Sequence, residues 1–159
     1  MTVYLLHFHT PLIGKSRKPG GKTQTCQHYL GSTTGELARR IAFHAASTWE
    51  ELGMPEPTER GTTRCGITRG KGAVVVAAAN SAGIAWVVAR IWEGDVDLEY
   101  ALKKRNNNAE LCPLCHPRLA RFVYQGPVLC NQAWRNQFLM TVPAGELAQL
   151  TLLDTVLPF

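Results

Sequence analysis

Residues 2–8 (TVYLLHF), 25–30 (TCQHYL) and 84–92 (IAWVVARIW) decide the fold, because each has the length of a strand and is rich in β-branched, aliphatic or aromatic residues. The first two segments are separated by a polar, basic and turn-rich connection, residues 14–22 (GKSRKPGGK). They therefore most simply form a hairpin with a long loop. The third segment is almost wholly apolar, which predicts a buried strand.

The segment after the second strand predicts an amphipathic helix. Leu37 and Ile41 are spaced by four residues, as expected for one buried helix face, and the helix should run to about Ser47. Thr33 or Thr34 would supply the side-chain oxygen that caps its first turn.

Two further helices are expected on either side of the third strand. The apolar residues 73–82 predict a helix that ends at Gly83, where glycine adopts a left-handed cap easily. Asp95 or Asp97 would start the other, whose acidic first turns and basic last turn suit the helix dipole. The order strand, strand, helix, helix, strand, helix predicts an α+β fold, with helices packed on a small three-stranded antiparallel or mixed sheet.

The chain divides by pattern into a first domain, residues 1–108, and a C-terminal extension, residues 109–159. Within the extension, residues 120–124 and 138–142 predict short strands, and residues 145–153 predict a helix or a strand. The extension contains a Cys-x-x-Cys-His turn.

Charge and composition restrict the class of protein. The 159 residues carry a net charge of +5, with 17 Lys and Arg against 12 Asp and Glu. The basic excess lies in residues 1–109, which suits a polyanionic partner because contacts to phosphates release counterions; a basic soluble surface is the alternative.

No apolar stretch approaches the roughly 20 residues needed to cross a membrane, so we expect a cytoplasmic protein. Its five cysteines would then be reduced or bind metal.

Four elements of the first domain carry a family resemblance. Thr-Val-Tyr at residues 2–4 and Tyr-Leu-Gly at residues 29–31 lie in the two hairpin strands, Arg40 and His44 share a helix face, and Glu99 lies on the last helix. Together, over roughly the first 108 residues, they resemble the GIY-YIG nuclease superfamily. The connection between the two tyrosines is longer than is typical of that family, and its first glycine is replaced by threonine.

The resemblance implies a metal-dependent endonuclease that hydrolyses DNA phosphodiester bonds. Tyr4 would be the general base and Tyr29 would order the water or the phosphate, while His44 relays a proton. Arg40 would hold the scissile phosphate, a role that its planar, permanently charged guanidinium suits. Glu99 would bind Mg²⁺ or Mn²⁺, since Mg²⁺ keeps most of its water and prefers few protein carboxylates.

Each assignment has an ordinary structural alternative. The two tyrosines could be half-buried strand aromatics, Glu99 a solvated helix residue, and Arg39 competes with Arg40 for the phosphate. The alternative function is an inactive DNA-binding or interaction module of the same fold. A small catalytic module of this kind could also need a separate specificity protein.

Two further groups of residues are expected to bind DNA or metal. The basic loop should contact DNA through Lys15, Arg17, Lys18 and Lys22, and Asn108 is the preferred DNA-binding residue among the three consecutive asparagines. Cys112 and Cys115 have the spacing of half a zinc site, with His116 and Cys130 as candidates for further ligands. Without a second Cys pair, reduced cysteines in a tight turn are favoured over structural zinc. The remaining histidines are expected to be structural or surface residues: His7, His9 and His28.

Overall fold

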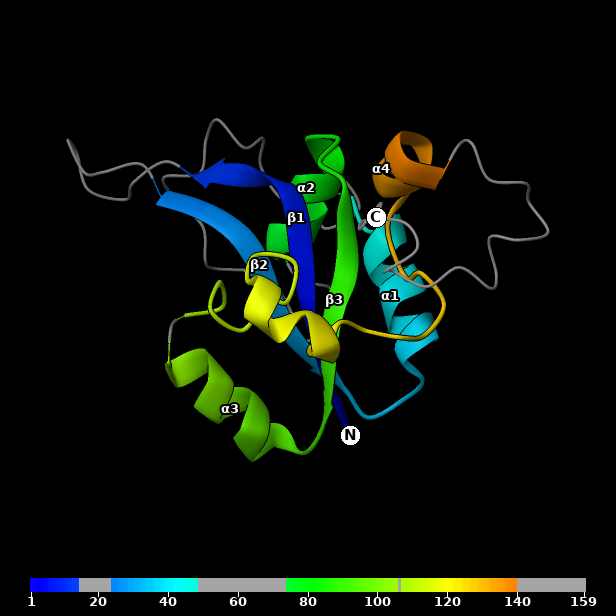
Figure 1. The fold of residues 1–159 in the computed structure, drawn as a ribbon. Coiled ribbons are helices and arrows are strands. Elements are labelled where there is room, and N and C mark those ends of the chain that lie inside the picture. Colours follow the sequence, from blue (N-terminus) through cyan, green and yellow to red (C-terminus); the bar gives the residue numbers. More distant parts are fainter. Residues whose placement is uncertain (15–23, 49–73, 106, 140–159) are drawn as a thin grey trace.

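The structure, a computed structural model, has an α+β fold built on one three-stranded sheet (Figure 1). The residues whose structure is described are 1–14, 24–48, 74–105 and 107–139. The predicted fold class and the predicted order of the first six elements are confirmed. None of the helices in the described ranges has the length and hydropathy needed to span a membrane.

The sheet is fully antiparallel, with strand order β2-β1-β3. Its strands are β1 (Thr2–Gly14), β2 (Gln24–Thr33) and β3 (Trp86–Glu93). The predicted hairpin of β1 and β2 is therefore confirmed, and β1 extends past the predicted end at Phe8. In the hairpin register Tyr4 lies opposite Gly31, and His7 lies opposite His28.

Alternation along the central strand divides the core into two layers. On one face Tyr4, Leu6 and Phe8 pack against Ile41 and Val76, and all five side chains are buried. Ile41 belongs to helix α1 (Leu37–Ala46), and Val76 belongs to helix α2 (Val74–Ser81). This face of the sheet therefore carries the helix with the predicted arginine and histidine.

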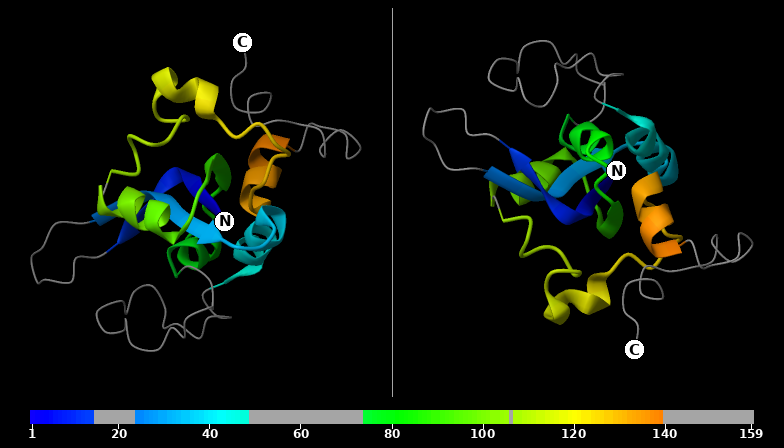
Figure 2. Two further views of the ribbon diagram at one scale, coloured as in Figure 1. Left: turned by 90° about the horizontal axis from the view of Figure 1, so that it is seen from below. Right: turned by 90° about the horizontal axis from the view of Figure 1, so that it is seen from above.

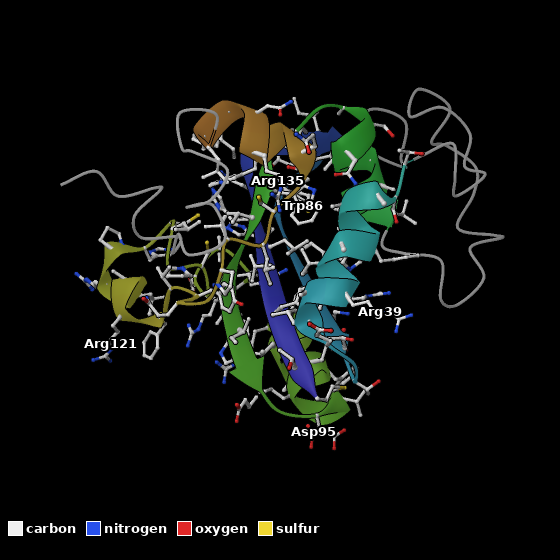
Figure 3. All side chains as sticks on the ribbon, turned by 90° about the vertical axis from the view of Figure 1, so that its right-hand side faces the viewer. Arg39, Trp86, Asp95, Arg121 and Arg135 are labelled. Atoms are coloured by element: carbon white, nitrogen blue, oxygen red, sulfur yellow. The ribbon has the colours of Figure 1, made fainter. Side chains whose placement is uncertain are left out.

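The opposite face packs against the third helix and the extension. Val3 and Leu5 of β1 contact Leu102 of α3 (Val96–Lys104) and Cys112 of the extension. Figures 2 and 3 show that α2 and the turn carrying Arg121 lie on opposite sides of the strands. The sheet thus separates two environments within one small fold.

The helix ends follow local sequence signals in two of three predicted cases. Asp95 caps α3, because its side chain accepts a hydrogen bond from the Leu98 N–H at 3.0 Å. Gly83 follows α2 with φ +66°, the left-handed conformation predicted for it. The predicted threonine cap of α1 is wrong: the cap position is Glu36, and the Thr33 hydroxyl instead accepts from the Gly35 N–H.

The predicted strand at residues 120–124 is also wrong, because this part of the extension forms a 3-10 helix, η2 (Pro117–Phe122). Pro117 favours the first helical position, and the Arg90 guanidinium stacks between the rings of Trp92 and Phe122, which fixes the turn on the sheet.

The next elements are α4 (Gln132–Trp134) and the π-helical turn η3 (Arg135–Leu139). The last two residues of this turn, Phe138 and Leu139, are therefore not in the strand predicted for residues 138–142. The rest of that segment and residues 145–153 lie outside the described residues.

Part of the extension runs beside β3, along the edge of this strand that does not pair with β1. Tyr124 N–H donates to the Ala89 carbonyl at 3.0 Å, and Val88 N–H donates to the Leu129 carbonyl at 2.8 Å. These bonds cover part of the β3 edge, which would otherwise present unpaired backbone groups. The division into residues 1–108 and 109–159 stays a prediction, although the described part of the extension shares its core with the sheet.

Candidate active site and metal centre

Two tyrosines meet on the α1 face of the hairpin. The ring centroids of Tyr4 and Tyr29 are 6.4 Å apart. A Cβ atom at Gly31 would lie 2.7 Å from the Tyr4 phenol oxygen and 2.8 Å from a ring carbon of Tyr29. Because both distances are shorter than a real Cβ contact, glycine is needed there to leave room for the two rings. The glycine of the Tyr-Leu-Gly motif therefore has a direct packing role.

Helix α1 brings Arg40 and His44 to the first tyrosine. The phenol oxygen of Tyr4 lies 2.6 Å from Nε2 of His44, and Nε of Arg40 donates to the same oxygen at 3.4 Å. A guanidinium can only donate, so the Tyr4 hydroxyl is directed as a donor towards His44. Tyr4 and His44 are fully buried, whereas Arg40 is half-buried.

Burial sets the protonation of these groups. Burial, aided by the charge of Arg40, lowers the pKa of His44 to about 4, so the imidazole is neutral near pH 7 and can accept from Tyr4. Burial also raises the pKa of Tyr4, although the hydrogen bond and charge of Arg40 oppose that rise. The pKa of Tyr29 is raised by burial and by Tyr4. Both phenols are therefore neutral at physiological pH in this arrangement.

The neighbouring arginine lies elsewhere. Arg39 is exposed, and its side chain extends from α1 away from the sheet (Figure 3). The structure thus brings Arg40, and not Arg39, into contact with Tyr4.

Glu99 is a half-buried carboxylate on α3. It accepts hydrogen bonds from the Ser32 hydroxyl at the end of β2 and from the Lys103 ammonium one helix turn away. Burial alone would raise the pKa of Glu99, but the bonds from Lys103 and Ser32 and the charge of Arg40 outweigh it and lower the pKa. The carboxylate is thus ionised near pH 7. Its charge in turn raises the pKa of Tyr4 and Tyr29, which places it within electrostatic range of both phenols.

Among the predicted DNA-binding residues, only Asn108 lies in the part of the chain that the structure describes. The Asn108 carbonyl accepts from the Leu111 N–H in the turn before Cys112, and its side-chain oxygen is buried without a partner in the described ranges. No hydrogen bond among those residues joins Asn108 to the tyrosines. The basic loop lies outside the described residues, and it includes Lys15, Arg17, Lys18 and Lys22.

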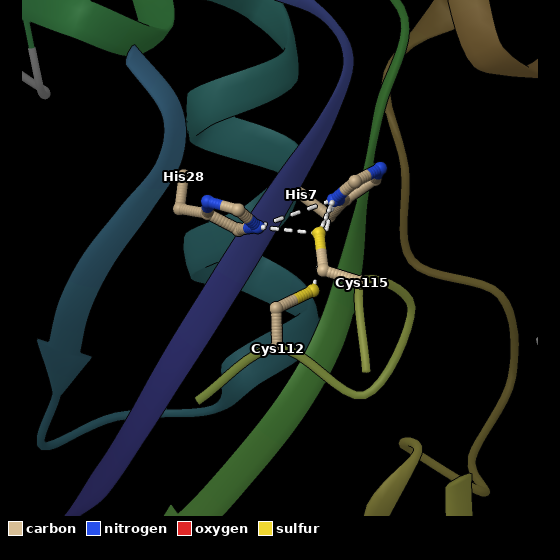
Figure 4. Close-up of side chains that lie close together, drawn as sticks. All are labelled: His7, His28, Cys112 and Cys115. Carbon is tan, nitrogen blue, oxygen red and sulfur yellow. Dashed lines mark hydrogen bonds between the residues drawn. The ribbon is translucent and has the colours of Figure 1, made fainter. Parts of the chain in front are cut away.

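A second group of chemically active side chains lies on the other face of the hairpin (Figure 4). His7 of β1 and His28 of β2 are cross-strand neighbours, and Cys112 and Cys115 approach them from the extension. One ligand atom from each residue lies within 4.8 Å of every other. Two imidazoles and two thiols form a donor set typical of zinc and not of magnesium, so this group could bind a metal ion.

The local environment suits metal ligands. Burial lowers the pKa of His7 and of His28 to about 4 each, so each imidazole is neutral near pH 7 and has one unprotonated nitrogen that can bind a metal ion. Burial and the neighbouring Cys115 raise the pKa of the Cys112 thiol, while hydrogen bonds from the backbone N–H groups of Cys115 and Leu114 oppose that rise. The turn therefore already directs backbone donors at the Cys112 sulfur.

The ligand set differs from the one predicted. Cys112 and Cys115 belong to the group, but the predicted ligands His116 and Cys130 do not: His116 is exposed, and Cys130 is buried in a separate core beside Val87. In their place stand the two histidines expected to be structural or surface residues. The hairpin register contained the missing signal, because pairing Tyr4 with Gly31 necessarily places His7 opposite His28.

No protein-family model, curated protein or solved structure matches this chain.

Proposed function

We propose that this protein is a metal-dependent endonuclease of the GIY-YIG type, which hydrolyses phosphodiester bonds in DNA. The observation that carries the proposal is the hydrogen-bonded group of Tyr4, Arg40 and His44. The family resemblance selects these residues from separate parts of the sequence, and their side chains are in contact in the folded chain. Tyr29 borders the same group, with its ring centroid 5.7 Å from that of His44.

The accessible groups of the site suit phosphate binding. Arg40 is half-buried and uses only Nε on Tyr4 among the described residues, so its two terminal nitrogens remain for the scissile phosphate. Such contacts catalyse the reaction by stabilising the charge that develops on the nonbridging oxygens. Tyr29 is also half-buried, and it would order the attacking water or the phosphate.

The buried groups of the site suit proton movement. When the attacking water loses a proton to the Tyr4 oxygen, the hydroxyl proton of Tyr4 can pass to Nε2 of neutral His44, 2.6 Å away. The water oxygen then forms the new bond to phosphorus as the bond to the leaving oxygen breaks. Because Tyr4 is fully buried, this step requires that substrate binding open a path for water to its phenol oxygen.

Glu99 is the residue that would hold Mg²⁺ or Mn²⁺. Its carboxylate is ionised and only half-buried, so an ion could keep most of its water while bound to one protein oxygen. The ion would take the place of the Lys103 ammonium at one carboxylate oxygen. When bound, such a cation supplies charge stabilisation for the phosphate and favours ionisation of nearby phenols.

Cleavage of labelled supercoiled and branched DNA with Mg²⁺ or Mn²⁺ tests the proposal. We expect Arg40→Ala and Glu99→Gln to reduce cutting by at least about 10²-fold, the usual effect of removing one group that stabilises the transition state. The matched controls are Arg39→Ala and Asp97→Asn, exposed residues on the same two helices, and they should cut at nearly the wild-type rate. Equal loss in a variant and its control would argue against the assigned site.

The second candidate is a DNA-binding or interaction module that retains the fold without activity. It is favoured if folded wild-type chain binds DNA but cuts no substrate with either metal. A cut that appears only when a second protein is added would instead indicate a separate specificity partner. We further propose a cytoplasmic location, because Cys26, Cys112, Cys115 and Cys130 are not joined in disulfides.

A further inference from the structure

Four donor atoms converge at one point between the hairpin and the extension. Nδ1 of His7 lies 3.3 Å from Nε2 of His28, and that nitrogen lies 3.2 Å from Sγ of Cys115. The sulfurs of Cys112 and Cys115 are each 3.6 Å from Nδ1 of His7. The residues come from three segments of the chain, and Figure 4 shows their side chains pointing towards one another.

These separations match the edges of a metal-centred tetrahedron. Zinc binds histidine nitrogen at about 2.0 Å and cysteine sulfur at about 2.3 Å, so neighbouring donors of a tetrahedral site lie about 3.3–3.8 Å apart. The four distances observed here span 3.2–3.6 Å. The two remaining separations, from Sγ of Cys112 to Sγ of Cys115 and to the ring of His28, are within 4.8 Å, so a central cation would need to draw these atoms together by no more than about 1–1.5 Å.

Hydrogen bonds alone do not account for the arrangement. Nδ1 of His7 has three potential partners, the His28 nitrogen and both sulfurs, yet one ring nitrogen can carry only one proton. One proton cannot bridge three partners at once. A single cation binds all four lone pairs together, which is the arrangement that a closed structural site requires.

Each half of the group is held in place by ordinary secondary structure. The antiparallel register makes His7 and His28 direct cross-strand neighbours, so their side chains share one face. Cys112 and Cys115 lie on a tight turn closed by the bond from the Cys115 N–H to the Cys112 carbonyl at 3.2 Å. The hairpin thus fixes the two histidines and the turn fixes the two cysteines. Packing of the turn on the hairpin then forms one site from ligands 105 residues apart in the sequence.

We propose that His7, His28, Cys112 and Cys115 bind one structural Zn²⁺ ion. The ion fastens the extension to the β1–β2 hairpin on the face opposite the tyrosines. With four protein ligands it has no open position for a substrate, so it stabilises the fold and takes no part in hydrolysis. This proposal stands whether or not the chain is a nuclease.

Metal analysis of freshly purified, tag-free chain tests the site. We expect one zinc per chain in the wild type and less than a tenth of that in Cys112→Ser and Cys115→Ser. Cys130→Ser and His116→Ala are the matched controls, because they remove the same residue types outside the group, and they should retain full zinc. Zinc retained in the Cys112 and Cys115 variants, or iron in place of zinc, would overturn the proposal.

X-ray absorption on the wild-type chain tests the ligand set without any variant that could fail to fold. We expect two sulfur neighbours at about 2.3 Å and two nitrogen neighbours at about 2.0 Å. Replacement of zinc by Co²⁺ should give the thiolate charge-transfer bands and the strong visible bands of a tetrahedral site. A shell of oxygen atoms only, or an octahedral cobalt spectrum, would show adventitious metal and refute the inference.

Discussion

Gly31 shows how one residue without a side chain can shape the proposed catalytic group. Its missing Cβ leaves the space in which the rings of Tyr4 and Tyr29 approach each other. A methyl group added at this position would therefore displace the two phenol rings.

We expect Gly31→Ala to abolish DNA cleavage while the chain still folds. The new methyl group would displace both phenols, and such overpacking costs about 1–3 kcal/mol of folding free energy. Gly35→Ala is the control, since the nearest atom to a Cβ there is 3.9 Å away. Cleavage assays beside urea unfolding measure both effects; full activity in Gly31→Ala would show that the position of the phenols is unimportant.

His44 should make stability depend on pH. Its pKa is about 4 in the folded chain against 6.5 ordinarily, so between these values only the unfolded chain binds the proton. Stability is therefore complete above about pH 6.5, falls as the pH drops towards 4, and changes little below that. At about 1.4 kcal/mol for each pKa unit, the loss is about 3 kcal/mol.

Urea unfolding of wild type and His44→Gln at pH 7 and pH 4 isolates this contribution. Glutamine can still accept from Tyr4 but does not titrate, so the variant should lose about 3 kcal/mol less than wild type on acidification. Other histidines contribute equally to both chains and cancel in the comparison. An identical pH dependence in the two chains would contradict the prediction.

Between the elements, the half-buried Asn80 and the buried Asn131 join helices to the sheet. Asn80 of α2 donates to the carbonyls of His44 and Ser47 at the end of α1, and accepts from Nε1 of Trp86 at 2.7 Å. Asn131 donates to the Asn80 side chain and caps α4 through the Trp134 N–H. The network fixes the end of the helix that carries Arg40 and His44.

Asn80→Ala should lower the free energy of unfolding by about 2–4 kcal/mol. The variant removes the Asn80 bonds to the Trp86 indole and to the Ser47 carbonyl, while the His44 carbonyl keeps the bond from the Ser47 N–H, and each buried unpaired group costs about 1–3 kcal/mol. Asn136→Ala, which loses one exposed bond to Gln132, should cost no more than about 0.5 kcal/mol. Chemical denaturation of both variants decides; equal costs would show that the network adds little.

Across the whole chain, the sheet places the tyrosine group and the proposed zinc site on opposite faces. A variant that loses zinc should therefore have a lower free energy of unfolding, but it should keep most of its cleavage activity as long as it stays folded. We expect Cys115→Ser to unfold at a lower temperature than wild type and yet to cut DNA within about threefold of the wild-type rate where it remains folded. Thermal unfolding and cleavage at low temperature test this, and a folded but inactive variant would show that the two faces are coupled.

The basic loop gives a prediction about DNA affinity. If its cations bind phosphates, replacing Lys15, Arg17, Lys18 and Lys22 by Ala should lower the salt dependence of binding. The slope of log affinity against log salt should fall by about 0.9 for each phosphate that is no longer neutralised. The double variant Lys104→Ala, Arg118→Ala removes exposed cations elsewhere and should change the slope less. An unchanged slope in the loop variant would exclude the loop from the interface.

Local patterns in the sequence were enough to predict the first six strands and helices and their order. Strand alternation, the Asp95 cap and the left-handed Gly83 depend on neighbours in the chain, so they can be read without the fold. Local preference failed where a distant partner decided the outcome. Residues 120–124 have strand composition, but Pro117 and the stacking of Phe122 on Arg90 produce a 3-10 turn.

The two candidate sites differ in how much of each could be predicted from the sequence. Through the family resemblance, the sequence alone selected Tyr4, Tyr29, His44 and one of two adjacent arginines as candidates, because each lies in a short motif on a predicted element. Only the tertiary structure distinguished Arg40 from Arg39 by contact with Tyr4, and only it brought the two histidines of the hairpin to the cysteine turn. The physical reason is that a metal site needs donor atoms a few ångströms apart, and packing of the extension on the sheet sets those distances.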